Sequence, residues 1–144
     1  VLASPLLSFH VAIIMFAYSL LAFLFFNGIT ALVLWHTENG VRLADRLSDL
    51  SRLILYPAVF LLALGIFIGA VWANVSWGRY WGWDPKETWA LIALMVYAVS
   101  FHRASLPACR RPIFFHLYLV LAFLTVLMTY FGVNFLLGGL HSYA

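Results

Sequence analysis

The residues with the greatest chemical capacity in this sequence are its tryptophans and histidines. Five of the six tryptophans lie between residues 72 and 89, and five histidines are spread along the 144-residue chain. The indole rings alternate with Gly78 and Gly82, which leave room for a flat ligand to approach the backbone. Neutral imidazole is the commonest side-chain ligand of metal ions. Together these residue types point to a planar molecule that carries a metal ion.

The amino-acid composition indicates whether the chain is surrounded by water or by lipid. Hydrophobic residues make up 65% and charged residues 9%, whereas soluble domains have about 45–50% and about 25%. The sequence contains continuous apolar runs of about 20 residues. Such runs exclude a transmembrane β-barrel, whose strands of about ten residues alternate in polarity. The single cysteine, Cys109, excludes an internal disulfide and a thiolate cluster, so a ligand must be held by nitrogen, oxygen or stacking. We therefore expect an all-α integral membrane protein.

Four apolar runs predict a bundle of four transmembrane helices in a single membrane domain, residues 1–144. Asp84-Pro85-Lys86-Glu87 predicts the start of the third helix, with Asp84 as N-cap and Glu87 closing a capping box. Residues 38–52 predict a short amphipathic helix on the membrane surface. The chain begins with valine, and we expect it to be a fragment of a longer protein. The predicted spans are residues 11–35, 53–72, 85–102 and 113–131.

The basic residues predict the orientation of these helices. Six of the eight lie in the segments after the first and third runs, and two lie after the second (Arg42, Arg46, Arg52, Arg103, Arg110 and Arg111 against Arg79 and Lys86). Because cytoplasmic loops are enriched in Lys and Arg, the Trp-rich loop and both chain ends are expected on the outer side. The net charge of +3 is explained by this topology, and no nucleic-acid partner is expected.

The orientation sorts the histidines into two groups. His36, His102 and His116 lie near the cytoplasmic ends of spans, whereas His10 precedes the first span and His141 follows the fourth, on the side of the tryptophans. A single interfacial histidine is typically a polar anchor. Two neutral imidazoles beside an aromatic platform suit the two axial positions of a haem iron. His36 and His116 are interpreted as structural residues.

The tryptophans divide in a similar way. Trp72 and Trp89 mark helix ends and are typical of the membrane interface. Trp77, Trp81 and Trp83 are predicted to form the platform, and the spacing of four places Trp77 and Trp81 on one face of a helical turn.

The stretch Trp77-Gly-Arg-Tyr-Trp-Gly-Trp-Asp-Pro-Lys-Glu-Thr-Trp-Ala90 resembles the tryptophan-rich WWD signature of haem-handling proteins in cytochrome c maturation. Its Trp-Asp-Pro-Lys-Glu-Thr-Trp ending is similar to the CcsA (ResC) family of the system II pathway. With the flanking histidines, the resemblance covers nearly all 144 residues. It implies haem b as a non-covalently held substrate. It also implies a CcsB/ResB-type partner subunit or fused region, and apocytochrome c as protein substrate.

The resemblance also implies roles for three histidines. His10 and His141 match the external histidines that are axial ligands of haem iron in the family. His102 matches an intramembrane histidine that holds haem on its way outward, with a second ligand outside this chain.

Four charged residues surround the expected platform. Haem propionates need cationic partners or exposure. Arg79 and Lys86 are both candidates for this contact. Arg79, inside the tryptophan cluster, is the better one, and simple solvation is the favoured interpretation of Lys86. Asp84 and Glu87 are explained as helix caps, and the fixed place of Asp84 in the family motif implies a further role in orienting a haem-facing group.

These observations predict a membrane haem-handling core with holocytochrome c synthase (haem lyase) activity. It would present haem at the outer face of the bacterial cytoplasmic membrane, or of the thylakoid membrane if plastid-encoded. Haem would be attached to the Cys-x-x-Cys-His segment of apocytochrome c. The alternative is a bis-His membrane cytochrome b that transfers electrons, although such bundles usually pair histidines within their spans.

Overall fold

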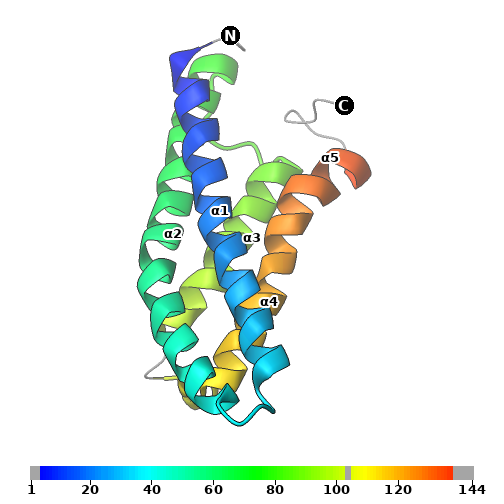
Figure 1. Cartoon of the computed structure of the whole chain (residues 1–144). Coiled ribbons are helices and arrows are strands. Elements are labelled where there is room, and N and C mark those ends of the chain that lie inside the picture. Colours follow the sequence, from blue (N-terminus) through cyan, green and yellow to red (C-terminus); the bar gives the residue numbers. More distant parts are fainter. Residues whose placement is uncertain (1–3, 103–104, 138–144) are drawn as a thin grey trace.

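The computed structural model describes residues 4–102 and 105–137, without the side chains of residues 108 and 109, and these residues are helical apart from short connections (Figure 1). The main helices are α1 (Pro5–Leu34), α2 (Gly40–Trp77), α3 (Pro85–Val99) and α4 (Pro112–Leu127). Two short 3-10 turns, η1 (Ser100–His102) and η2 (Pro107–Arg110), connect α3 to α4. A π-helical turn, η3 (Met128–Gly132), continues α4 into α5 (Val133–Leu136).

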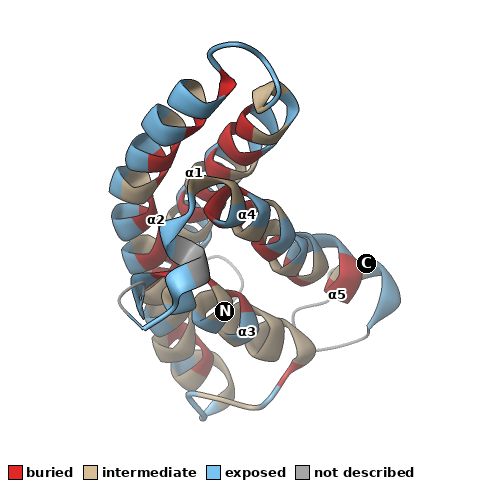
Figure 2. Ribbon diagram, turned by 90° about the horizontal axis from the view of Figure 1, so that it is seen from below, coloured by how far each residue is buried: buried red, intermediate tan, exposed pale blue. Residues whose placement is uncertain are grey.

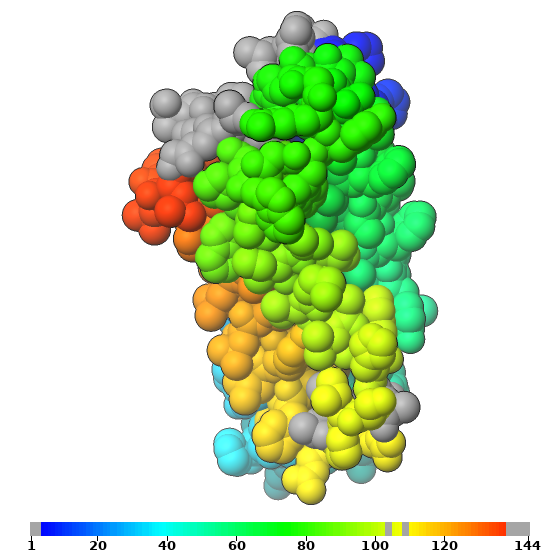
Figure 3. Space-filling view, turned by 180° about the vertical axis from the view of Figure 1, so that it is seen from behind, coloured from blue at the N-terminus to red at the C-terminus, as the bar shows by residue number. Residues whose placement is uncertain are grey.

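The helices form an antiparallel bundle. α1 and α2 make a hairpin, α4 packs against α1, and α3 packs against α4 and α2. The start of α1, the connection between α2 and α3, and α5 lie at one end of the bundle (Figure 1). Figure 3 shows the green segment around residues 72–90 at the same end as the blue N-terminal residues. The start of α1, which carries His10, and the segment that carries five of the tryptophans therefore lie at the same end of the bundle.

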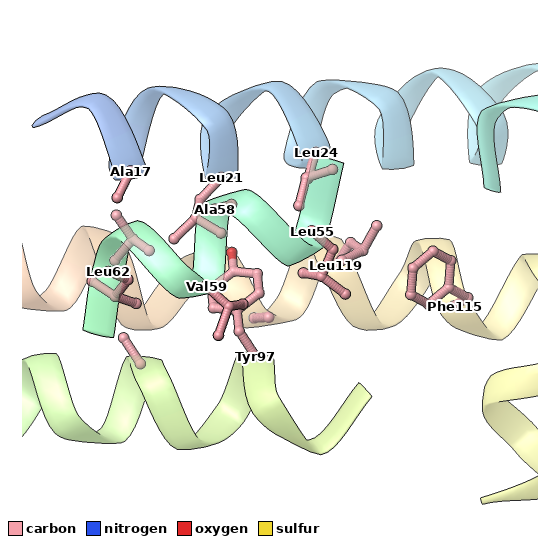
Figure 4. Packing of buried hydrophobic residues seen from close by; sticks show 13 residues of the cluster. Ala17, Leu21, Leu24, Leu55, Ala58, Val59, Leu62, Tyr97, Phe115 and Leu119 are labelled. Carbon is pink, nitrogen blue, oxygen red and sulfur yellow. The ribbon is translucent and has the colours of Figure 1, made fainter. Parts of the chain in front are cut away.

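The core combines leucines with small residues. Leu21, Leu62 and Leu119, from α1, α2 and α4, are fully buried, and Ala17 and Ala58 let the helices approach one another (Figure 4). Figure 2 shows the buried faces turned inward and the exposed faces turned outward. The outward faces carry many large apolar side chains, including Val33, Phe60 and Phe67. An apolar exterior around a small-residue interior is typical of helices packed in lipid.

Three helical stretches are long and apolar enough to cross a membrane, namely Pro5–Leu34, Gly40–Trp77 and Pro112–Leu136. The all-α membrane class is therefore confirmed. The predicted third span corresponds to α3 of 15 residues followed by η1. Asp84 caps α3 as expected, with the capping box to Glu87 formed.

Two boundaries differ from the expectations. Residues 38–52 do not form a separate surface helix, because α2 runs unbroken for 38 residues from Gly40. Its first part is held by packing, since Ala44, Ser48 and Ser51 are buried on one face. The Nε2 of His116 donates to the Ala44 carbonyl oxygen at 2.9 Å, which joins α4 to this part of α2 and supports a structural role for His116.

α1 also begins earlier than predicted. Ser4 is its N-cap, accepting a hydrogen bond from the Leu7 amide at 3.2 Å, and Pro5 occupies the first turn. Helical structure from Pro5 places His10 in the second turn of α1, not before the first span. The predicted span began where the apolar run begins, after His10, whereas the cap at Ser4 and the proline at position 5 start the helix earlier.

The contact between α1 and α4 depends on Gly28. A Cβ at Gly28 would lie 2.9 Å from Val120 Cγ2 and 3.0 Å from the His116 carbonyl oxygen, and backbone cannot move as a side chain can. We expect Gly28→Ala to destabilise the bundle by about 1–3 kcal/mol, the usual effect of overpacking. Thermal unfolding of the purified protein measures this. Ala12→Val, at an exposed position of α1, should leave the unfolding temperature nearly unchanged.

Candidate functional site

A cavity of about 320 Å³ lies among the start of α1, the later part of α2, the start of α3, and the η3–α5 region. Its volume falls in the range of about 300–1,000 Å³ of small-molecule sites. Most of the lining is apolar or aromatic, and a few polar side chains converge on it. The lining residues used below are His10, Gly69, Trp72, Trp81, Lys86, Glu87 and Asn134.

His10 is the histidine among the described residues that line this cavity, and histidine is a common metal ligand. Its Nδ1 lies 2.8 Å from the carbonyl oxygen of Gly65 on α2. A carbonyl can only accept, so Nδ1 carries the proton and donates it. In a neutral ring this leaves the lone pair on Nε2, the tautomer that a metal-ligating histidine adopts when a backbone carbonyl holds its other nitrogen.

Two glycines of α2 make room for this arrangement. A Cβ at Gly69 would lie 2.6 Å from His10 Cε1 and 2.8 Å from its Nδ1, and a Cβ at Gly65 would lie 2.5 Å from Ile14 Cδ1. The imidazole therefore lies directly against the α2 backbone. Neither Gly65 nor Gly69 was predicted to belong to the site, although a Gly-x-x-x-Gly pattern in an apolar helix signals close helix approach.

The tryptophans occupy different environments and do not share one surface. α2 ends at Trp77, because Gly78 adopts a left-handed conformation with φ 73°. Trp77 and Trp81 therefore do not share a helical face, contrary to the expectation. Trp77 packs edge-on against Trp72 with ring centroids 4.9 Å apart.

Trp72 is 2% exposed and lines the cavity, so its interpretation as an interfacial anchor is wrong. Trp81 lines the cavity too, and Trp83 packs edge-on against it at 5.9 Å while remaining 71% exposed. Trp77 and Trp83 are not among the described residues that line the cavity. Of the three predicted platform residues, Trp81 is the one placed to contact a ligand there.

Glu87 determines the conformation of the loop that carries Trp81 and Trp83. Its Oε2 accepts from the amides of Gly82, at 2.8 Å, and Asp84, at 3.2 Å. Trp83, between these two residues, has a φ of 56°, a left-handed conformation that costs a bulky residue about 1–3 kcal/mol. One carboxylate oxygen thus holds both amides beside a strained tryptophan.

The two basic residues of this region lie in different places. Lys86 lines the cavity, and its Nζ donates to Asn134 Oδ1 at 2.9 Å. Arg79 is exposed, and its guanidinium lies over Gly82. Arg79 is not among the described residues that line the cavity. Asn134 was missed by the sequence reasoning, since nothing in its local sequence indicates a contact with a lysine 48 residues away.

The remaining predicted residues do not meet His10 in the described part of the chain. His102 is exposed in η1, at the opposite end of the bundle from the cavity. His141 lies outside the described residues. Asp84 is buried as the N-cap of α3, with Oδ2 accepting from the Lys86 amide at 3.3 Å.

The fold and the site define a helical membrane protein with a histidine set into a cavity beneath a tryptophan-bearing loop. The family model described as Cytochrome C assembly protein matches residues 1–141. Protein NrfI of Wolinella succinogenes is 41% identical over 149 aligned residues, which cover 100% of this chain and 16% of NrfI. Cytochrome c biogenesis protein CcsA of Gloeobacter violaceus is 45% identical over 103 residues, 70% of this chain and 30% of that protein. CcsA of a Picosynechococcus species is 47% identical over the same shares.

The chain belongs to the cytochrome c assembly protein family, which confirms the resemblance to CcsA. Membership places it in cytochrome c biogenesis, a process that handles haem. The chain spans 16% of NrfI and 30% of the CcsA proteins named above.

The two amides held by Glu87 provide a test of the loop. We expect Glu87→Ala to speed hydrogen exchange at the Gly82 and Asp84 amides by about tenfold or more, because each loses a charge-assisted hydrogen bond. Site-resolved hydrogen exchange by NMR measures this. The Thr88 amide, which donates to the Asp84 carbonyl oxygen at 2.9 Å, serves as an internal reference. Unchanged exchange at both amides would contradict the assignment of Glu87 as the clamp.

Proposed function

We propose that this chain holds haem b, as a substrate, in the cavity beside His10 and presents it for covalent attachment to apocytochrome c. The observation that carries the proposal is the hydrogen bond from His10 Nδ1 to the Gly65 carbonyl. It selects the tautomer whose Nε2 can ligate iron, in a cavity with an aromatic and largely apolar lining. His141 is proposed as the second axial ligand, from a segment outside the described residues.

In this proposal the chain positions the haem for the thiols of apocytochrome c and does not activate either of them chemically. His10 Nε2 supplies one axial ligand, and Trp81 offers an aromatic face in the cavity lining. The Cys-x-x-Cys-His segment of apocytochrome c would approach from the same end of the bundle. Each thiol then adds across one vinyl group, with sulfur bonding to one vinyl carbon and the hydrogen going to the other. Because this addition releases no leaving group and needs no oxidant, holding thiol and vinyl together supplies the rate enhancement.

Topology and partners complete the proposal. α3 with η1 covers 18 residues from Pro85 to His102, about 26 Å of helix, and is proposed as an additional span, the third in chain order. The distribution of basic residues supports a position of the Trp-bearing loop outside the bacterial cytoplasmic membrane, or on the corresponding side of a thylakoid membrane. A CcsB/ResB-type subunit or fused region is proposed to complete the protein, including the second ligand for haem near His102. Trp77, Trp83, Asp84 and Arg79 remain proposed as haem-proximal residues of the loop.

The proposal predicts that His10 is required for the haem spectrum. We expect His10→Ala in the intact protein to lose the low-spin bis-histidine absorption spectrum, because one axial ligand is removed. Added imidazole should restore it by occupying the vacated position. An unchanged low-spin spectrum in both His10→Ala and His141→Ala would show that the iron is held elsewhere.

The room left by Gly69 gives a second prediction. We expect Gly69→Ala to weaken haem binding about tenfold or more, because the new Cβ overlaps the imidazole ring and overpacking costs about 1–3 kcal/mol. Spectral titration measures this. Gly28→Ala is the matched control, since it overpacks the bundle at Val120 and His116 without touching His10. Equal haem affinities in the two variants would contradict the proposed binding of haem in the cavity beside His10.

A bis-histidine electron carrier remains the competing function, and it is favoured by one observation, the position of His10 inside a helix. Co-expression with an apocytochrome c separates the two. The synthase predicts covalent haem on the apocytochrome that is lost with His10→Ala. An electron carrier would show a reversible redox spectrum and no covalent product.

A further inference from the structure

We propose that the exposed ring of Trp83, at the edge of the cavity, contacts the protein substrate and binds the segment of apocytochrome c that carries the Cys-x-x-Cys-His sequence. The inference rests on the proposed function and names the residue of the loop that this partner meets. It follows from three properties of Trp83, namely its backbone conformation, its exposure and the contacts that hold it in place.

Trp83 has a backbone conformation that its side chain disfavours. Its φ of 56° lies in the left-handed region, which glycine enters freely and a bulky residue does not. Gly82 directly precedes it, yet among the described glycines Gly78 is the one with a positive φ. A shift of one residue along the loop would place the left-handed conformation on Gly82. The loop therefore keeps a strained tryptophan next to a glycine that would adopt the same conformation without strain.

Burial of the indole ring does not offset this strain, since Trp83 is 71% exposed. The strain is offset by Glu87, whose Oε2 accepts from the amides of Gly82 and Asp84 on both sides of Trp83. Strained conformations that the surrounding structure holds in place cluster at functional sites. A fixed and exposed indole ring loses little conformational freedom on binding, and tryptophan is enriched among the residues that dominate protein interfaces. These features are typical of a residue that contacts a protein partner.

The position of the ring indicates which partner it meets. Trp83 packs edge-on against Trp81, with ring centroids 5.9 Å apart, and Trp81 lines the cavity. Because Trp83 is not among the described residues that line the cavity, a molecule on its exposed face lies beside the cavity and not inside it. In the proposed function the protein substrate comes to this place, since its two thiols have to meet a ligand held in the cavity. Tyr80, which is 59% exposed in the same loop, offers a second aromatic side chain to such a peptide.

An anchor in the membrane interface is the other common role of an exposed tryptophan. An anchoring ring has only to reach the lipid headgroups, and many loop conformations allow this. It does not require a left-handed backbone or a carboxylate that holds both flanking amides. The support that Glu87 gives to Trp83 therefore favours a partner that needs the ring in a defined position.

The test measures the binding of a peptide to the intact protein, loaded with haem b, in nanodiscs. The peptide carries the Cys-x-x-Cys-His segment with serine in place of both cysteines, so that no covalent attachment occurs. We expect Trp83→Asn to weaken peptide binding about tenfold or more, because the aromatic contact is lost, and to leave the haem spectrum and the haem affinity unchanged. Asparagine tolerates the left-handed region, so the loop should keep its conformation. Protection of the Gly82 and Asp84 amides from hydrogen exchange checks this.

Two further variants serve as controls. Trp83→Phe keeps an aromatic ring and should retain most of the peptide binding. Phe135→Ala removes a 75% exposed ring from α5, at the same end of the bundle, and should leave peptide binding unchanged.

The possible outcomes separate this inference from the proposed function. A peptide affinity that is equal in Trp83→Asn and the unmodified protein overturns the inference, and the ring is then an anchor in lipid or a contact of the haem. A peptide that the unmodified protein does not bind overturns it as well. Haem binding that is independent of His10 overturns the proposed function instead, and it is measured on a different variant.

Discussion

The close approach of α1 to α2 at Gly65 and Gly69 is the constraint on which the site depends. The absence of side chains at these positions admits Ile14 and the His10 ring against the α2 backbone. The same approach brings His10 Nδ1 within 2.8 Å of the Gly65 carbonyl oxygen. Helix packing in lipid relies on small residues because hydrophobic burial does not distinguish a neighbouring helix from lipid tails. Here the packing contact also sets the orientation and the tautomer of the imidazole.

The second element of the site is a loop under strain. Trp83 in a left-handed conformation is unfavourable by itself, and Glu87 offsets this cost with two hydrogen bonds to the flanking amides. Since Glu87 also belongs to the first turn of α3, the start of that helix and the shape of the loop form one unit. Trp81 is thereby held at the cavity while Trp83 remains on the surface beside it.

Polar groups are arranged at the two functional ends of the cavity by contacts between distant helices. His10 is oriented by α2, and Lys86 is oriented by Asn134, 48 residues further along the chain. In both cases an uncharged oxygen, of a backbone carbonyl or of a side-chain amide, accepts the hydrogen bond.

Composition, apolar runs and capping residues determined the membrane class, the helical bundle and the start of α3, because these depend on hydrophobic length and local hydrogen bonds. The Trp-rich motif determined the family. The unbroken length of α2, the place of His10 inside α1, the burial of Trp72 and the contact of Lys86 with Asn134 were decided by tertiary structure. Each of these features depends on which helix surfaces pack together in the bundle. The sequence pattern along one helix shows which of its faces is apolar, but it does not show which other helix packs against that face. The sequence by itself thus indicated that His10 and the tryptophan segment share one end of the molecule. Only the packing of α1 on α2, and of the chain after α4 on α3, decided which of them face the cavity.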